Sequence, residues 1–167
     1  MPASERESLA IAIIDEAARR GLDLAVAESL TGGDVVSSLV AVPGASAVLR
    51  GGVVAYSTAI KASVLGVDRA LLAREGAVDP DVAVAMARGV RTVLAVDGMP
   101  TAIGVATTGV AGPDRQDGRP VGLVYVAVVD DNGEVAQEHR FSGDRAQIRA
   151  FATRAALALV ASRLGVR

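Results

Sequence analysis

The chain has 167 residues and a formal net charge of −2, and 51% of its residues are hydrophobic whereas only 2% are aromatic. It contains no cysteine, which excludes disulfides, zinc–thiolate centres and cysteine nucleophiles, and its slightly acidic balance argues against nucleic-acid binding, which needs a basic surface. No apolar run approaches the ~20 residues that span a bilayer, and Met1–Arg6 shows no leader peptide. We therefore expect one soluble, cytoplasmic domain over residues 1–167, with no nucleic-acid or membrane partner.

The hydrophobic pattern of the first half predicts helices and strands in alternation. In chain order we expect a helix over Glu5–Arg20, a strand over Leu22–Ala27, a helix opened by Thr31-Gly32-Gly33 and closed by Pro43-Gly44, a strand over Val48–Tyr56, and a helix that Ser57 caps, that carries Lys61 and that ends at Gly66. The pair Gly51-Gly52 inside the second strand indicates a bulge, tight packing or a ligand contact.

The second half predicts a helix, a buried strand, a hairpin and a closing helix. The expected ranges are a helix from Pro80 to about Val96, strands over Thr101–Thr108, Val121–Val129 and Val135–Phe141, and a helix over roughly Asp144–Arg163. The stripe of the first of these helices that should face the core is Val82, Ala85, Met86, Gly89 and Val93. The turn Asp130-Asp131-Asn132-Gly133 requires an antiparallel pair, so the sheet should be mixed. An interior of small aliphatic side chains suits a sheet covered by helices.

Lys61 is the one lysine among 17 basic residues. A chain that uses arginine for ordinary positive charge keeps lysine where arginine would fail. Burial can lower the pKa of an ammonium group by several units, whereas a guanidinium stays charged, so a buried lysine can act as a general base. The alternative is codon bias that left one solvated lysine by chance.

The segment Ala27-Glu28-Ser29-Leu30-Thr31-Gly32-Gly33 places a serine at the end of a strand and glycines at the start of a helix. This arrangement exposes a hydroxyl group and directs unpaired backbone N–H groups at a ligand, as in an oxyanion hole. The alternative is a serine or threonine helix cap followed by permissive glycines. If the two strands are parallel neighbours, Ser29 and Tyr56 end at the same edge and Lys61 leans back toward it. A serine with a lysine base is an established nucleophile.

Arg145 and Arg149 share one face of the first turns of the last helix, where a phosphate or carboxylate is readily held. The alternative is a capped helix with surface arginines. Thr107 and Thr108 precede the loop Gly109–Asp114, and either can contact a ligand or simply satisfy backbone groups at a strand end.

Other catalytic chemistry finds less support in the sequence. The only histidine, His139, lies in a polar run typical of an exposed edge strand, and no carboxylate stands at a recognisable spacing for a triad. Asp114 and Asp117 would hold magnesium only together with a substrate phosphate. We therefore predict no metal and no organic cofactor.

Several motifs taken in order resemble the C-terminal domain of the CinA family, the competence/damage-inducible proteins, over almost the whole chain. Besides the Ser29 segment and Lys61, they are Pro43-Gly44-Ala45-Ser46, Arg50-Gly51-Gly52-Val53-Val54-Ala55-Tyr56-Ser57, Leu65-Gly66-Val67, Thr108-Gly109-Val110-Ala111-Gly112-Pro113, Pro120-Val121-Gly122 and Gly143-Asp144-Arg145. Two segments depart from the family's pattern, Asp114–Arg119 and Ala77-Val78-Asp79-Pro80. The first bears on the contacts of the loop, and the second exchanges one helix cap for another.

The resemblance implies an α/β fold, a three-layer α/β/α sandwich whose mixed sheet has a parallel core and an antiparallel hairpin. It also implies an amidohydrolase that converts nicotinamide mononucleotide to nicotinic acid mononucleotide and ammonia, with a serine–lysine pair that matches Ser29 and Lys61 and with Tyr56 nearby. The family's large N-terminal domain and its nucleotide-pyrophosphate chemistry are not expected in this chain.

In the mechanism that we expect, neutral Lys61 takes the proton of Ser29, Tyr56 orients the lysine or relays its proton, and backbone N–H groups of Leu30, Thr31, Gly32 and Gly33 stabilise the oxyanion. Arg145 and Arg149 are the candidates for the nucleotide phosphate, and Thr108 is a further substrate contact. The alternatives are a Ser/Lys amidase for another small molecule and a catalytically silent nucleotide-binding module. Alanine-rich helices are compatible with a homodimer.

Overall fold

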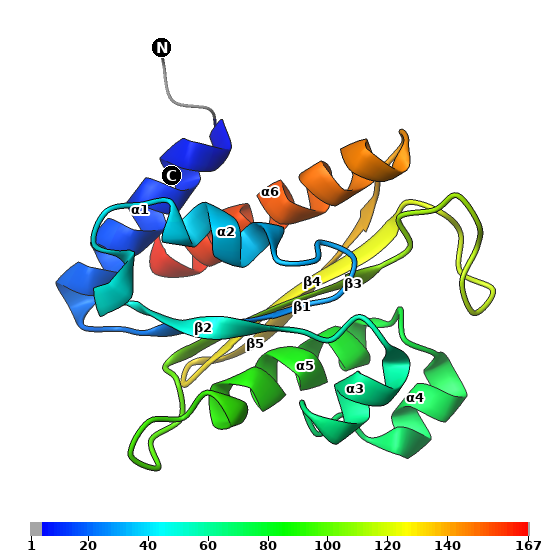
Figure 1. The fold of residues 1–167 in the computed structure, drawn as a ribbon, viewed down its shortest axis with the longest axis horizontal. Helices are drawn as coiled ribbons and strands as arrows, with labels where there is room; N and C mark the ends of the chain where they lie inside the picture. Colours follow the sequence, from blue (N-terminus) through cyan, green and yellow to red (C-terminus); the bar gives the residue numbers. More distant parts are fainter. Residues whose placement is uncertain (1–4, 167) are drawn as a thin grey trace.

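A computed structural model describes residues 5–166 of the chain (Figure 1). Its elements, in chain order, are α1 (Glu5–Arg20), β1 (Leu24–Glu28), α2 (Asp34–Val40), a short 3-10 helix (Ala45–Ala47), β2 (Leu49–Val54), α3 (Thr58–Ser63), α4 (Arg69–Glu75), α5 (Pro80–Val93), β3 (Ile103–Gly109), β4 (Leu123–Asp130), β5 (Gly133–Arg140) and α6 (Arg145–Leu164). None of the helices in these residues is both long and apolar enough to cross a membrane.

The five strands form one mixed sheet in the order β2-β1-β3-β4-β5. Strands β2, β1 and β3 run parallel, and β4 and β5 continue the sheet with antiparallel pairing. Figure 1 shows α1, α2 and α6 on one side of the sheet and α3, α4 and α5 on the other. The prediction of a three-layer α/β/α sandwich with a parallel core and an antiparallel hairpin is therefore confirmed.

The alternation of side chains along β1 decides what each end of the strand presents to each layer. Leu24 and Val26 belong to the core cluster beneath α1, α2 and α6, whereas Ala25 and Ala27 belong to the cluster beneath α5. Because successive side chains of a strand point to opposite faces, residue 28 continues toward the α2 layer and residue 29 toward the α3 layer. The chain thus separates two adjacent polar residues onto opposite faces of the sheet.

Most predicted elements are present, with ends shifted by a few residues. Helix α4 was not predicted; Asp68 caps it by accepting a hydrogen bond from the N–H of Ala70 at 2.9 Å. Of the predicted core stripe of α5, only Val82 and Met86 are buried; Ala85 and Gly89 are half-buried, and Val93, at the end of the helix, is 42% exposed. The face that packs on the sheet is made by Val82, Ala83, Met86, Ala87 and Val90. Ser57 does precede α3, but its side chain makes no capping hydrogen bond.

The Gly51-Gly52 pair is a bulge and a close contact. The pairing of β1 with β2 shifts register between Leu24 and Ala25, and Gly51 has φ +143°. A Cβ atom on Gly52 would lie 2.3 Å from the side chain of Val36 in α2. Gly52 therefore lets α2 pack closely on β2.

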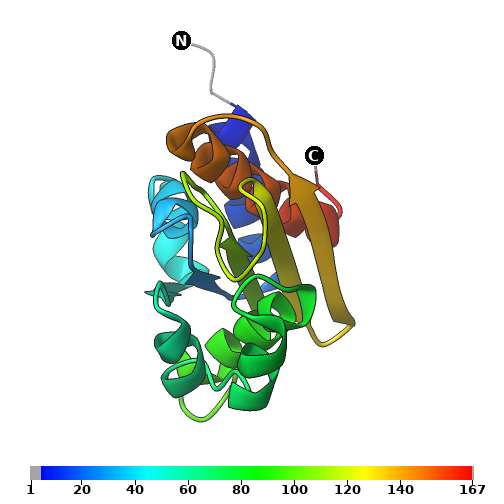
Figure 2. The same cartoon turned by 90° about the vertical axis from the view of Figure 1, so that its right-hand side faces the viewer.

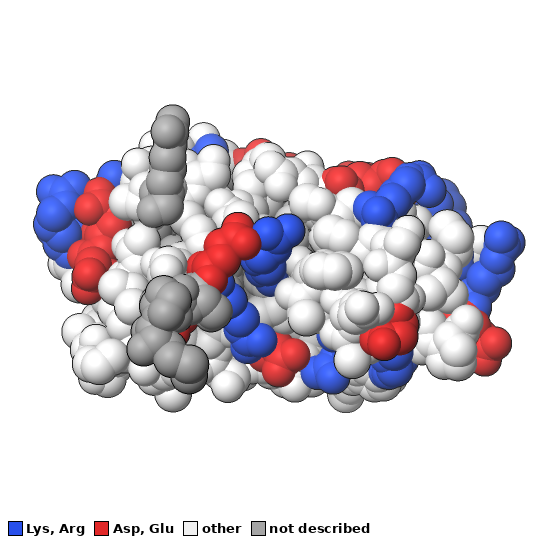
Figure 3. All heavy atoms as spheres, turned by 90° about the horizontal axis from the view of Figure 1, so that it is seen from above, with Lys and Arg blue, Asp and Glu red and all other residues white. Residues whose placement is uncertain are grey.

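Two views locate the remaining surface features. Seen from the side on which β1 and β2 end, the start of α6, the loop that follows β3 and the α3–α4 region surround that edge of the sheet (Figure 2). On the face seen in Figure 3, basic and acidic side chains lie next to one another, with uncharged areas between them.

Candidate active site

The structure brings Ser29 and Lys61 together at the carboxyl edge of the parallel strands. The Nζ atom of Lys61 lies 3.0 Å from Ser29 Oγ and donates a hydrogen bond to the carbonyl oxygen of Ala55 at 2.6 Å. The Lys61 side chain is 1% exposed, and burial lowers its pKa from 10.5 to about 8. An amine with this pKa is partly unprotonated near neutral pH, as a general base must be.

The meeting of the two side chains follows from the local folds. Ser29 directly follows β1 and points to the α3 layer, as the alternation of the strand requires. Lys61 is the fourth residue of α3 and leans back toward the beginning of that helix. The backbone N–H of Ala55 donates to the carbonyl of Glu28 at 2.8 Å, so the end of β1, which Ser29 follows, is joined to the segment that leads from β2 into α3.

The helix-cap interpretation of the Ser29 segment is not what the structure shows. The N-cap residue of α2 is Gly33, which has no side chain. Neither Ser29 nor Thr31 caps the helix through its hydroxyl group. Ser29 contacts Lys61, and Thr31 Oγ1 lies 2.8 Å from Thr107 Oγ1 in the interior. The buried carboxylate of Glu28 instead accepts the first N–H groups of α2. Sequence reasoning assigned no role to Glu28, although a glutamate ending an otherwise apolar strand was a visible signal.

Not all of the backbone N–H groups predicted to bind an oxyanion are free in the structure. The N–H of Gly33 is bonded to Glu28 and that of Gly32 to the carbonyl of Ser29, so neither is available to a substrate. Thr31 is fully buried. Leu30 lines the cavity, and its N–H has no hydrogen-bond acceptor within residues 5–166. The N–H of the residue that follows a nucleophile is a recurrent oxyanion donor, so Leu30 is the remaining candidate.

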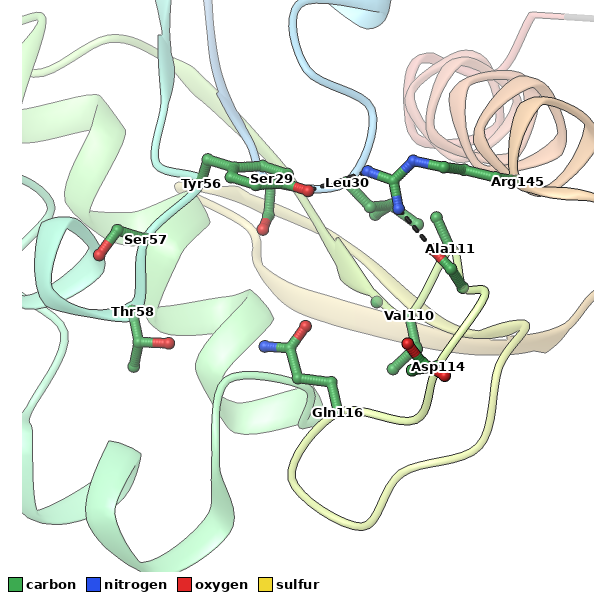
Figure 4. Close-up of a pocket in the computed structure, with 12 residues that line it drawn as sticks. Ser29, Leu30, Tyr56, Ser57, Thr58, Val110, Ala111, Asp114, Gln116 and Arg145 are labelled. Atoms are coloured by element: carbon green, nitrogen blue, oxygen red, sulfur yellow. Dashed lines mark hydrogen bonds between the residues drawn. The ribbon is translucent and has the colours of Figure 1, made fainter.

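A cavity of about 360 Å³ opens above Ser29. Its lining residues are Ser29, Leu30, Tyr56, Ser57, Thr58, Gly109, Val110, Ala111, Gly112, Asp114, Gln116 and Arg145. Figure 4 shows Tyr56 and Arg145 on one side of this space and Gln116 and Asp114 across from them. Gln116 was not among the predicted site residues, because nothing in the sequence of its loop indicated which side chains face inward.

Tyr56 and Arg145 are joined across the mouth of the cavity. Arg145 donates to the Tyr56 hydroxyl at 2.9 Å and to the carbonyl of Gly112 at 2.5 Å, as the dashed lines in Figure 4 mark. The hydroxyl of Tyr56 is therefore engaged with Arg145, whereas we expected it to orient or relay for Lys61. Both partners of Arg145 are neutral oxygens, and within residues 5–166 this guanidinium forms no ion pair. Its charge is free to bind an anion.

Arg149 has a different position from the one predicted. Its guanidinium donates to the carbonyls of Leu30 and Thr31 at 2.9 and 2.8 Å and lies 3.4 Å from Asp34. Arg149 does not line the cavity. It holds the turn after Ser29 from the α6 side, so a phosphate contact from Arg149 is not supported.

The other predicted residues lie beside the cavity or far from it. Thr108 is buried and donates to the carbonyl of Ala77 at 2.6 Å, which is the backbone role left open by the sequence. Asp117 accepts from the N–H of Ala77 at 3.3 Å. His139 is in β5, at the opposite edge of the sheet from β2, where it stacks on Phe141 at 5.2 Å and burial lowers its pKa. Across residues 5–166, no three His, Asp or Glu side chains gather into a potential metal site.

Fold and site together define a three-layer α/β protein with a serine bonded to a buried lysine at the carboxyl edge of its parallel strands. Comparison with known protein families agrees with the resemblance that the motifs indicated, because the family model of the CinA C-terminal domain matches residues 6–164. The chain belongs to the CinA C-terminal domain family.

Both full-length relatives and solved structures are similar to this chain. It is 47% identical over 154 residues to a CinA-like protein of Frankia casuarinae and 49% identical over 137 residues to a putative competence-damage inducible protein of Desulforamulus reducens, covering 92% and 82% of this chain. The aligned parts are 34% and 32% of those proteins, so the chain spans about a third of their length.

Two of the similar solved structures illustrate how much of the chain is matched. They are the competence/damage inducible protein CihA from Agrobacterium tumefaciens (TM-score 0.89, 34% identity, 99% of this chain and 98% of that chain) and a competence or damage-inducible protein from Enterobacter asburiae (TM-score 0.90, 28% identity, 97% and 99%).

Proposed function

We propose that this domain hydrolyses the carboxamide of nicotinamide mononucleotide, giving nicotinic acid mononucleotide and ammonia, with Ser29 as nucleophile and Lys61 as general base. The observation that carries the proposal is the 3.0 Å contact between a buried lysine, whose pKa is lowered to about 8, and a serine that lines a cavity. The choice of substrate rests on the family resemblance.

The first half of the reaction forms an ester on Ser29. Neutral Lys61 accepts the proton of the Ser29 hydroxyl while Oγ attacks the carbonyl carbon of the carboxamide. The resulting oxyanion accepts a hydrogen bond from the backbone N–H of Leu30. The C–N bond then breaks as Lys61 returns the proton to the leaving nitrogen, and ammonia departs.

The second half repeats the same steps with water. Lys61 accepts a proton from a water molecule as its oxygen attacks the ester carbonyl, and the C–Oγ bond breaks as the proton passes to Ser29. The hydrogen bond to the Ala55 carbonyl holds the Lys61 amine in place, because it uses one donor of the amine throughout. The residues return to their starting protonation states, and no metal or organic cofactor enters the scheme.

The phosphate of the nucleotide pairs with Arg145. This guanidinium lines the cavity and forms no ion pair among residues 5–166, and guanidinium groups recognise phosphate through paired N–H donors. Phosphate binding replaces the neutral contacts to Tyr56 or Gly112. The aromatic ring of Tyr56 then forms one wall of the cavity for the pyridine ring.

The test is ammonia release from nicotinamide mononucleotide by the purified protein. Ser29→Ala and Lys61→Arg should each abolish it, whereas Ser63→Ala, an exposed serine on the same helix as Lys61, should not. Release of ammonia only from other amides would indicate a Ser/Lys amidase of different substrate. Binding of the nucleotide without any release would indicate a silent binding module.

A further inference from the structure

Glu28 is a buried carboxylate that the proposed reaction does not use. It is the last residue of β1, its exposure is 0%, and it immediately precedes Ser29. Burying an ionised carboxylate is unfavourable unless hydrogen bonds replace its hydration. Its surroundings therefore have to supply donors, and those donors show what the side chain holds.

The donors are backbone N–H groups at the start of α2. Glu28 Oε2 accepts from Gly33 at 2.9 Å and from Val35 at 3.1 Å, and Oε1 accepts from Val36 at 2.8 Å. Helices normally bind these N–H groups through a side chain at the N-cap position, but Gly33 has none. A carboxylate at this end also interacts favourably with the positive end of the helix dipole. Glu28 thus serves as the cap of α2 from a neighbouring strand.

These contacts make the turn that carries Ser29 a closed loop. The backbone of Glu28 is held in the sheet, where its carbonyl accepts from the N–H of Ala55 at 2.8 Å. Its side chain holds the far end of the turn at Gly33. The turn between these two points cannot open unless one set of bonds breaks.

The same residue connects both halves of the pair. The carbonyl of Ala55, whose N–H binds Glu28, accepts the hydrogen bond of Lys61 Nζ at 2.6 Å. Arg149 draws the carbonyls of Leu30 and Thr31 to the α6 side. Glu28 and Arg149 together set the peptide orientations of the turn, and this turn bears both the Ser29 hydroxyl and the Leu30 N–H.

We infer that Glu28 is a positioning residue for Ser29: its carboxylate keeps Ser29 Oγ in reach of Lys61 and binds the α2 N–H groups, which leaves Leu30 as the oxyanion donor. The inference rests on the proposed function only in assigning Ser29 as nucleophile. It predicts a defect in the chemical step rather than in nucleotide binding, because Tyr56 and Arg145 lie outside the Glu28 contacts.

The experiment compares Glu28→Gln with Asp68→Ala. The amide keeps the size of the carboxylate but loses its charge and turns an N–H₂ group toward donors. Asp68→Ala removes a different helix cap, that of α4, which contributes no residue to the cavity. For Glu28→Gln we expect kcat for nicotinamide mononucleotide to fall by about 100-fold, the loss typical of a small misplacement, with KM within about threefold. Asp68→Ala should change neither parameter although it weakens a helix end.

A second readout does not depend on the nucleotide. A fluorophosphonate probe labels activated serines, and the rate at which it modifies Ser29 is measured by mass spectrometry. Slower labelling in folded Glu28→Gln, with wild-type labelling in Asp68→Ala, supports the inference even if wild-type protein leaves nicotinamide mononucleotide unchanged. Equal labelling rates in Glu28→Gln and wild type overturn it. If Glu28→Gln does not fold, Glu28→Asp, which keeps the charge with a shorter reach, is measured in its place by the same criteria.

Discussion

Replacing Lys61 with methionine should stabilise the folded protein at neutral pH while it abolishes turnover. The lysine is 1% exposed, and burial lowers its pKa from 10.5 to about 8. The folded state therefore disfavours the ammonium form that the unfolded chain carries freely. Methionine has a similar length and no charge, so it should fill the same space without this penalty.

The magnitude follows from the pKa difference. Each pKa unit corresponds to about 1.4 kcal/mol, so a lowering from 10.5 to about 8 represents about 3 kcal/mol at neutral pH. Losing the donor to the Ala55 carbonyl costs about 1 kcal/mol. The expected net gain is about 2 kcal/mol, or about 4–8 °C in the melting temperature for a domain of this size.

The pH dependence gives the sharper test. Between the folded pKa of about 8 and the unfolded value of 10.5, the unfolded chain binds more protons, so the stability of the wild type rises with pH in that window. Below pH 8 both states are protonated and the penalty is complete. The advantage of Lys61→Met should therefore shrink by about 2 kcal/mol between about pH 7 and about pH 9.5.

Urea unfolding of the two proteins at both pH values measures this difference, since the contributions of other groups cancel. Two curves of stability against pH that run parallel would refute the conclusion that Lys61 is buried at a lowered pKa. The test makes no use of the substrate.

Two predictions concern turnover. The kcat/KM for nicotinamide mononucleotide should rise with pH around a midpoint of about 8 and level off above it, because Lys61 must lose its proton to act as the base; a flat profile across that midpoint would contradict this role. Arg145→Ala should raise KM for the nucleotide by about 10-fold to 100-fold, the loss of a charged hydrogen bond, with a much smaller effect on free nicotinamide. Equal effects on the two compounds would show that the phosphate binds elsewhere.

Much of the fold could be predicted because it depends on local patterns. Helical and strand periods located ten of the twelve elements in the described residues to within a few residues, and the prediction missed α4 and the short 3-10 helix. The buried run before Thr108 and the hairpin turn at Asp130–Gly133 determined that the sheet is mixed. Helix α4 was overlooked because its short segment has no buried residue and hence no apolar stripe to detect.

The candidate site, like the fold, could be predicted from the sequence only in its local features. The sequence by itself determined which groups are reactive and where in the chain they lie: a serine after a strand, glycines before a helix, and one lysine near the start of another helix. Strand alternation, a local property, also places Glu28 and Ser29 on opposite faces.

Only the tertiary structure decided which donors and charges remain free. Arg149 and Arg145 are equivalent in the sequence, yet packing of α6 sets Arg149 on the carbonyls of Leu30 and Thr31, 119 and 118 positions earlier, and leaves Arg145 at the cavity. Glu28 accepts the N–H of Gly33, which we had expected to bind an oxyanion. An N–H group that donates to one acceptor is no longer free for a substrate. Which acceptor it meets depends on which segments the fold brings within about 3 Å.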